Sequence, residues 1–126
     1  MEIYTMQLSK WRLAKKQDIQ IIDCTLKSGV HHCGERWLAP TKNLLLAYKE
    51  GTIGKEQYEK EYLSIMRERY IRDKQWFIDF CNTKDPLAIA CYCKGGGFCH
   101  RYLLIKILDQ ICSHYNIPYT YKGELE

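Results

Sequence analysis

Alternating and continuous apolar patterns along the chain predict four strands. The segment EIYTMQ alternates with period two, QIIDCT is rich in β-formers, and the residues after Pro86 are almost all apolar, which is typical of a strand covered on both faces. A short last strand is expected in the tail. The predicted strands therefore lie at 2–7, 20–25, 85–93 and within 116–126.

Helical patterns fill the intervals between these strands. Thr41 is a suitable N-cap after Pro40, and the GTIG segment separates that helix from the next one. The last helix repeats leucine and isoleucine at helical spacing, so one of its faces is buried. The predicted helices lie at 8–17, 41–50, 55–74, 74–82 and 99–116.

This order of elements predicts an α/β fold. Strand, helix, strand, helical insertion, strand, helix and strand together indicate a mostly parallel sheet of about four strands with helices on both faces. The insertion falls between the second and third strands. Residues 26–40 show no usable periodicity and are expected to form a loop of about 15 residues, a length that in compact domains is usually functional or disordered.

Length and composition narrow the class of protein. The 126 residues fit a single domain over 1–126, and the formal charge of +4 suits an anionic small molecule better than a long duplex. No stretch is apolar enough to span a membrane and the start lacks the regions of a signal peptide, so a cytoplasmic location is expected. In that reducing compartment the seven cysteines predict no structural disulfide. The formation of an oligomer is left as an open alternative.

The segment CYCKGGGFCHR at 91–101 carries the densest chemistry. It lies between a predicted strand and a predicted helix, where ligands bind in parallel sheets. Gly95, Gly96 and Gly97 lack the Cβ atoms that would hold a ligand away from the backbone. The helix N-terminus that follows offers N–H groups to an anion.

Two cations can complete an anion site at this segment. The helix dipole contributes only about 0.3 to 1 kcal/mol to a nearby charge, so a fixed cation is needed as well. Lys94 and Arg101 are the candidates. A cation in the first turn of a helix is unfavourable to the dipole, so a bound phosphate explains Arg101 better than helix stability does.

The cysteines and the histidine of the segment admit several interpretations. Cys93 is either a nucleophile, as in Cys-based phosphatases and rhodaneses, or a thiol that only lines the site; seven residues separate it from Arg101, against five in the tyrosine phosphatase pattern. Cys91 is assigned to the core, and His100 either bonds the loop backbone or contacts the ligand. The spacing is not that of a standard zinc site, so neither a metal nor another cofactor is predicted, although a metal alternative would use Cys91, Cys93, Cys99 and His100, with His31, His32 or Cys33.

A second polar cluster follows the second strand. Asp23 and Thr25, with Lys27 and Ser28 beyond them, supply a carboxylate, a hydroxyl and a cation that could orient a sugar or activate water. In a parallel sheet this cluster opens on the same edge as the glycine segment. The alternative is that Asp23 caps a neighbouring loop and that Lys27 is solvated.

The chain resembles the domain-of-unknown-function 488 family of small bacterial and phage proteins over nearly its whole length. The matching segments include IIDCTLKSG at 21–29, LAPTKNLLLAYKEG at 38–51 and CYCKGGGFCHRYLL at 91–104. The resemblance implies a Rossmann-like three-layer domain and supplies no reaction. It also implies that Tyr58 and Tyr62, otherwise assigned to core packing, point hydroxyls into the site. The motif positions that it suggests are Asp23, Thr25, Lys27, Ser28, Lys49, Tyr58, Tyr62, Cys93, Lys94, Cys99, His100, Arg101 and Glu124.

Three functions fit these residues. The first is binding of a phosphate-bearing, nucleotide-like ligand with hydrolysis or group transfer, in which Asp23, His100 or Glu124 acts as acid or base. The second is a non-catalytic protein that sequesters a signalling nucleotide, such as a phage protein opposing bacterial immunity. The third is a nucleic-acid module, ranked last because basic and acidic residues alternate between 49 and 74.

Overall fold

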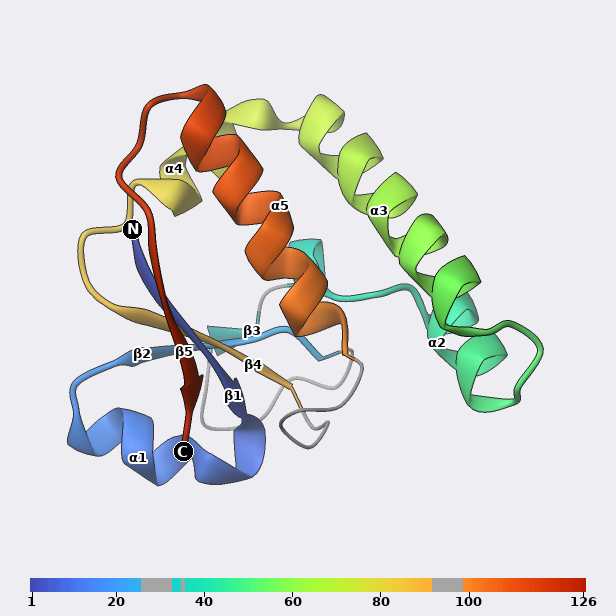
Figure 1. Cartoon of the computed structure of the whole chain (residues 1–126), viewed down its shortest axis with the longest axis horizontal. Helices are drawn as coiled ribbons and strands as arrows, with labels where there is room; N and C mark the ends of the chain where they lie inside the picture. Colours follow the sequence, from blue (N-terminus) through green and yellow to red (C-terminus); the bar gives the residue numbers. More distant parts are fainter. Residues whose placement is uncertain (26–32, 35, 92–98) are drawn as a thin grey trace.

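A five-stranded parallel sheet forms the centre of the protein (Figure 1). The structure is a computed structural model that describes residues 1–25, 33–34, 36–91 and 99–126. The strands lie in the order β3-β2-β4-β1-β5, and every neighbouring pair is parallel. They are β1 (Glu2–Gln7), β2 (Gln20–Asp23), β3 (Cys33–Gly34), β4 (Leu87–Cys91) and β5 (Thr120–Leu125).

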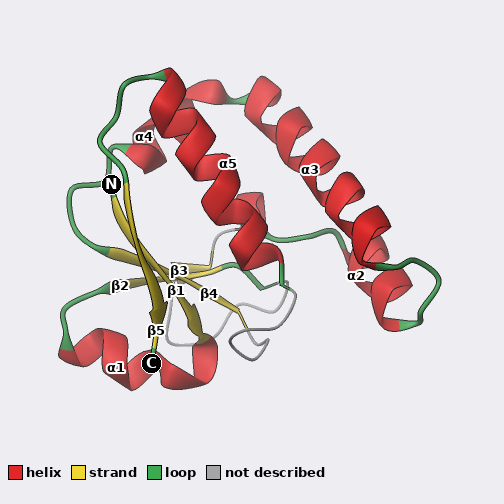
Figure 2. Ribbon diagram, in the orientation of Figure 1, coloured by secondary structure: helices red, strands yellow, loops and turns green. Residues whose placement is uncertain are grey.

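Helices cover both faces of the sheet and make three layers (Figure 2). One face is covered by α1, whose Ala14 packs in the smaller of two hydrophobic clusters. The helices α3, α4 and α5 cover the other face, over the larger cluster. The helices are α1 (Trp11–Lys16), α2 (Lys42–Lys49), α3 (Lys55–Arg72), α4 (Lys74–Cys81) and α5 (His100–His114). The predicted α/β, Rossmann-like three-layer fold is confirmed.

The central strand β4 shows how the sequence builds the two sides of the sheet. All five of its residues are buried. Because side chains alternate along a strand, Leu87 and Ile89 face the larger cluster under α5, while Ala88 and Ala90 face the smaller cluster under α1. A strand covered on both faces explains why the apolar run has no polar alternation.

The predicted helix starts and faces are also found. The side chain of Thr41 accepts a hydrogen bond from the amide of Leu44 at 3.2 Å, so Thr41 caps α2. In α5 the side chains of Leu104, Leu108 and Ile111 are buried, as their spacing predicted. These elements follow from local sequence patterns alone.

The prediction that residues 26–40 form one long loop was wrong in part. Within residues 26–40, Cys33 and Gly34 form the short strand β3, which pairs with β2 through Ile22 and Asp23. A turn of 3-10 helix follows at Arg36–Leu38. Two residues are too few to show a period, so only the neighbouring strand reveals this one.

The topology gathers the strand ends at one edge. All five strands are parallel, so their carboxyl ends lie together. The chain leaves the adjacent strands β1 and β4 in opposite directions, toward β2 under α1 and toward β5 under α5. In open α/β sheets this is where ligands bind. Among the described residues, no helix combines the length and the apolar character needed to cross a bilayer.

Candidate functional site

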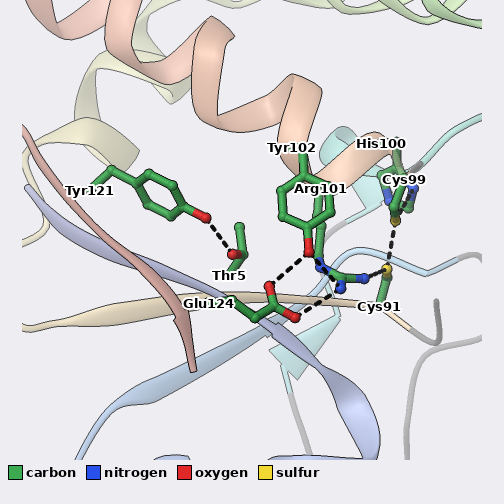
Figure 3. A network of polar contacts seen from close by, with 8 residues as sticks. All are labelled: Thr5, Cys91, Cys99, His100, Arg101, Tyr102, Tyr121 and Glu124. Carbon is green, nitrogen blue, oxygen red and sulfur yellow. Dashed lines mark hydrogen bonds and ion pairs between the residues drawn. The ribbon is translucent and has the colours of Figure 1, made fainter. Parts of the chain in front are cut away.

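The first turn of α5 brings Arg101 to the carboxyl edge of the sheet, with its side chain fully buried. Its NH1 group donates to the sulfur of Cys91 at 2.7 Å, and its NH2 group donates to Glu124 Oε2 at 2.9 Å (Figure 3). NH2 also lies 3.0 Å from the hydroxyl of Tyr102, which donates to the other carboxylate oxygen of Glu124 at 3.0 Å. Arg101 therefore points into the protein, between β4 and β5.

The charges in this cluster stabilise one another. Burial by itself lowers the pKa of the Arg101 guanidinium, but Cys91 and Glu124 outweigh it and hold that pKa above its ordinary value. Burial by itself raises the pKa of Glu124, but hydrogen bonds from Thr5, Arg101 and Tyr102 hold it below its ordinary value of 4.5. Arg101 and Glu124 are thus both charged at neutral pH.

Thr5 supports Glu124 from β1, the strand between β4 and β5. The side chain of Thr5 is fully buried, and its hydroxyl lies 2.6 Å from the hydroxyl of Tyr121. A carboxylate can only accept, so the hydrogen bond between Thr5 and Glu124 is donated by Thr5, and Tyr121 in turn donates to Thr5. The pairing of β1 with β5 makes this chain of contacts.

On the other side of Arg101, two thiols lie in contact. The sulfur atoms of Cys91 and Cys99 are 2.8 Å apart, and both residues are buried free cysteines. Cys99 Sγ is 3.7 Å from Nδ1 of His100. A hydrogen-bonded series therefore runs from His100 through Cys99 and Cys91 to Arg101 (Figure 3).

The tautomer of His100 follows from its second nitrogen. Nε2 lies 2.9 Å from the backbone carbonyl of Cys24, and a carbonyl only accepts, so Nε2 carries the hydrogen. In the neutral ring Nδ1 is then the basic nitrogen, and it faces Cys99. The predicted backbone bond of His100 is found, although it goes to the end of β2 rather than to the glycine segment.

Asp23 and Thr25 form a separate group at the same edge. Asp23 is fully buried, and its Oδ1 accepts from the amide of Thr25 at 2.9 Å and from its hydroxyl at 2.6 Å. Side chains alternate between the two faces of a strand. In β2, Asp23 therefore lies on the same face as Ile21, which belongs to the cluster under α1. In β4, Cys91 lies on the same face as Ile89, which belongs to the cluster under α5. Asp23 thus approaches the edge from the side opposite Cys91.

The two tyrosines implied by the resemblance lie in the core beside His100. Tyr62 is fully buried, and its hydroxyl donates to the carbonyl of Leu38 at 2.7 Å, with burial raising its pKa well above the ordinary value. The Tyr62 ring lies 5.6 Å from the ring of His100. The Tyr58 ring stacks on the Tyr62 ring, with 6.3 Å between their centroids. The hydrogen bond to Leu38 anchors the segment before α2 to α3.

Some predicted positions lie outside this arrangement. Lys49 is exposed at the end of α2. Within the described part of the chain, no group of three or more histidine, cysteine, aspartate or glutamate side chains could hold a metal ion. The predictions that lie outside the described residues concern Lys27, Ser28, His31, His32, Cys93, Lys94, Gly95, Gly96 and Gly97.

Sequence reasoning missed two members of the site. Cys91 was assigned to the core, yet its sulfur is the acceptor for Arg101. Thr5 was noted only as part of an alternating strand. The available signal was that Thr5 shares the face of the buried Ile3, where a hydroxyl needs a polar partner.

One family model matches most of the chain. The model DUF488-N3a, described as the active DUF488-N3 subclade, matches residues 5–111. The chain belongs to the DUF488 family. No curated protein and no solved structure matches it. The DUF488 match includes Cys91, Cys99, His100 and Arg101 but ends before β5, so Glu124 lies beyond the matched residues.

Proposed function

We propose that the carboxyl edge of this sheet binds a phosphate-bearing, nucleotide-like ligand and hydrolyses it or transfers part of it. The observation that carries the proposal is the contact of Arg101 with Cys91 at 2.7 Å, in the first turn of α5. A cation beside a sulfur atom favours the thiolate, which is the nucleophilic form of cysteine. Structural cysteines in apolar cores have no such partner.

In this proposal Arg101 supports the nucleophile instead of holding the phosphate. Both of its terminal nitrogens are engaged, by Cys91 on one side and by Glu124 and Tyr102 on the other. A Cys91 thiolate and the Glu124 carboxylate together exceed the single charge of Arg101. The ligand's negative charge therefore has to be met by other groups, and Lys94 and the backbone amides of the glycine segment are the proposed ones.

The thiolate of Cys91 attacks the phosphorus or sugar carbon of the ligand and forms a bond to it. The bond to the leaving group breaks, and the leaving group takes a proton from a neighbouring acid, for which His100 and Asp23 are the candidates. Water then breaks the bond to sulfur and returns a proton to the same residue. Cys91 and the acid are thereby restored. Cys93 stays a second candidate nucleophile predicted from sequence alone.

The positions of His100 and Asp23 suit this division of work. Nδ1 of His100 reaches Cys91 through Cys99, so it can take or return the proton of the thiol. Asp23 lies on the other side of the strand ends, fixed by two hydrogen bonds from Thr25. A ligand lying across the edge has one titratable group on each side of it.

The test combines native mass spectrometry with a conversion assay. The protein as purified from cells is examined for a carried ligand, and it is then incubated with a panel of nucleotides whose products are separated by liquid chromatography. We expect a bound phosphate compound and turnover that falls at least about 100-fold in Cys91→Ser, since covalent catalysis is lost. Cys112→Ser is the matched control, because Cys112 is a buried thiol away from this site.

The outcomes separate the candidate functions. Ligand recovered intact after heating, with no turnover of any nucleotide, supports the sequestering protein instead. Turnover that is unchanged in Cys91→Ser excludes the thiolate mechanism. Absence of both ligand and turnover excludes the proposed function. Binding of DNA or RNA that weakens steeply with salt would point to the nucleic-acid module.

A further inference from the structure

We propose that Cys91 and Cys99 form a reversible disulfide when the protein meets hydrogen peroxide, so that this pair of thiols is an oxidation site. The two sulfur atoms are 2.8 Å apart, and neither is part of a disulfide. A disulfide bond is about 2.05 Å long, so the sulfur atoms have to approach by less than about 1 Å. Cys91 ends β4 and Cys99 is the N-cap of α5.

Cys91 is the thiol that reacts first with peroxide. Its sulfur accepts a hydrogen bond from Arg101 NH1 at 2.7 Å, and the contact with Cys99 supplies a second donor when the Cys99 thiol points toward it. The contact with Arg101 favours negative charge on the Cys91 sulfur, and the contact with Cys99 does so while Cys99 gives its single hydrogen to Cys91 and not to Nδ1 of His100. Susceptibility to oxidation follows thiolate character, and a neighbouring second cysteine converts the first oxidation product into a disulfide.

The reaction balances with peroxide as the oxidant. The Cys91 thiolate attacks one peroxide oxygen, the O–O bond breaks, and a sulfenic acid forms while the second oxygen leaves as hydroxide and becomes water. Cys99 then gives its proton to Nδ1 of His100, 3.7 Å away, and attacks the sulfenic sulfur. The S–S bond forms and the sulfenic hydroxyl leaves as water with that proton. Two thiols and one peroxide give one disulfide and two waters.

Oxidation changes the partners of Arg101. The sulfur of a disulfide carries no negative charge, so among the described residues Glu124 is the counter-ion that Arg101 keeps. The new bond also ties the end of β4 to the start of α5 across residues 92–98 of the sequence. The oxidised protein has no Cys91 nucleophile, and its turnover should stop until a dithiol reduces the bond. That loss of turnover rests on the proposed function, whereas formation of the disulfide does not.

Cys91 and Cys99 are nearly completely buried, although slightly less so than the core thiols Cys81 and Cys112. Cys91 is 1% exposed and Cys99 is 4% exposed, whereas Cys81 and Cys112 are both 0% exposed. Cys81 and Cys112 are hydrogen-bonded to each other, which makes them a second pair of neighbouring thiols in the same chain. They serve as an internal control for proximity, because the cation that acts on them in the described part of the chain is the N-terminal ammonium, through its charge alone, and not a hydrogen-bonded guanidinium.

The experiment maps disulfides in the full-length protein. The reduced protein is exposed to hydrogen peroxide, remaining thiols are alkylated, and peptides are analysed by mass spectrometry without reduction. We expect the peptide pair joined through Cys91 and Cys99 to form at least about tenfold faster than the pair joined through Cys81 and Cys112, a difference equivalent to one pKa unit of thiolate stabilisation. Treatment with dithiothreitol should restore the free thiols.

Variants identify which cysteine is oxidised first. In Cys99→Ser the sulfenic acid on Cys91 should persist and react with dimedone, and in Cys91→Ser dimedone labelling should be lost. Cys112→Ser should leave the link between Cys91 and Cys99 unchanged. The mapping in the unaltered protein tests the proposal even if a variant fails to fold.

Two results would overturn the proposal. One is a Cys91 to Cys99 link that forms no faster than the link between the core thiols. The other is Cys91 joined to Cys93 or to a second chain instead of to Cys99. A disulfide that forms in a protein without turnover leaves the oxidation site standing and removes the proposed enzyme. Turnover in a protein that does not form the disulfide removes the oxidation site and leaves the proposed enzyme standing.

Discussion

The two pairs of neighbouring thiols differ in what lies beside them. Cys81 and Cys112 join α4 to α5 inside the larger hydrophobic cluster. Cys91 and Cys99 join β4 to the opposite end of α5, next to Arg101. Both pairs are buried, so burial alone does not distinguish a reactive thiol from a structural one. The charge beside the sulfur does.

The surroundings act differently on the two pairs of thiols. Burial, and then Cys112, raises the pKa of Cys81, and burial raises the pKa of Cys112 as well. At the other end of α5, Arg101 donates to the sulfur of Cys91 and so favours its thiolate. One helix therefore stabilises the core with its last turns and builds a charged site with its first turn.

Removal of the cation should have the largest effect. Arg101→Met leaves the Glu124 carboxylate without its ion-pair partner in a partly buried position, so the free energy of unfolding should fall by about 3 to 5 kcal/mol. Urea unfolding followed by circular dichroism measures it. Adding Glu124→Gln should recover part of the loss, because the uncompensated charge is then removed. A loss under about 1 kcal/mol in the single variant would mean that the pair behaves like an exposed one.

Exchange of a core thiol should have an intermediate effect. Cys112→Ser places a hydroxyl in the apolar cluster and should cost about 1 to 3 kcal/mol. Cys99→Ser should cost less, because the new hydroxyl can donate to Nδ1 of His100 or to the sulfur of Cys91. Thermal unfolding of the two variants side by side measures the difference. Equal losses would show that the surroundings of the two pairs are energetically alike.

The smallest expected effect is on the free energy of unfolding at acid pH. The pKa of Glu124 is lowered in the folded protein, so its ion pair contributes stability above its ordinary value of 4.5, and this contribution is lost as the pH falls through the folded pKa. The difference in unfolding free energy between the unaltered protein and Glu124→Gln should therefore shrink as the pH falls below 4.5. The side chain is 16% exposed, so solvent reduces the effect. Denaturation series at several pH values check this, and a difference that grows in acid would contradict it.

Most of the architecture could be predicted from local patterns. The apolar run of β4, the spacing of leucines in α5 and the cap at Thr41 each indicated an element that the structure contains. β3 could not be predicted in this way, since two residues carry no periodicity and their pairing depends on β2. The position of the site at the start of α5 was predicted from the same local rules.

The roles within the site could not be predicted to the same extent. The sequence suggested that a bound anion explains Arg101, but the described contacts give it Glu124 and Cys91 as partners inside the protein. Glu124 is 23 residues away along the chain and reaches Arg101 from β5, across the edge of the sheet. A contact of that range leaves no local pattern.

The sequence by itself determined where strands and helices form, because backbone geometry imposes fixed periods on buried side chains. It also determined that thiols, a histidine and an arginine follow one strand and begin one helix. Only the tertiary structure decided which groups meet. The order of strands places β1 between β4 and β5, and α5 packs over them, so that Glu124 and Cys91 contact one guanidinium and Thr5 hydrogen-bonds to Glu124. Their partners are set by the register of distant segments, and burial then requires every charge among them to be compensated.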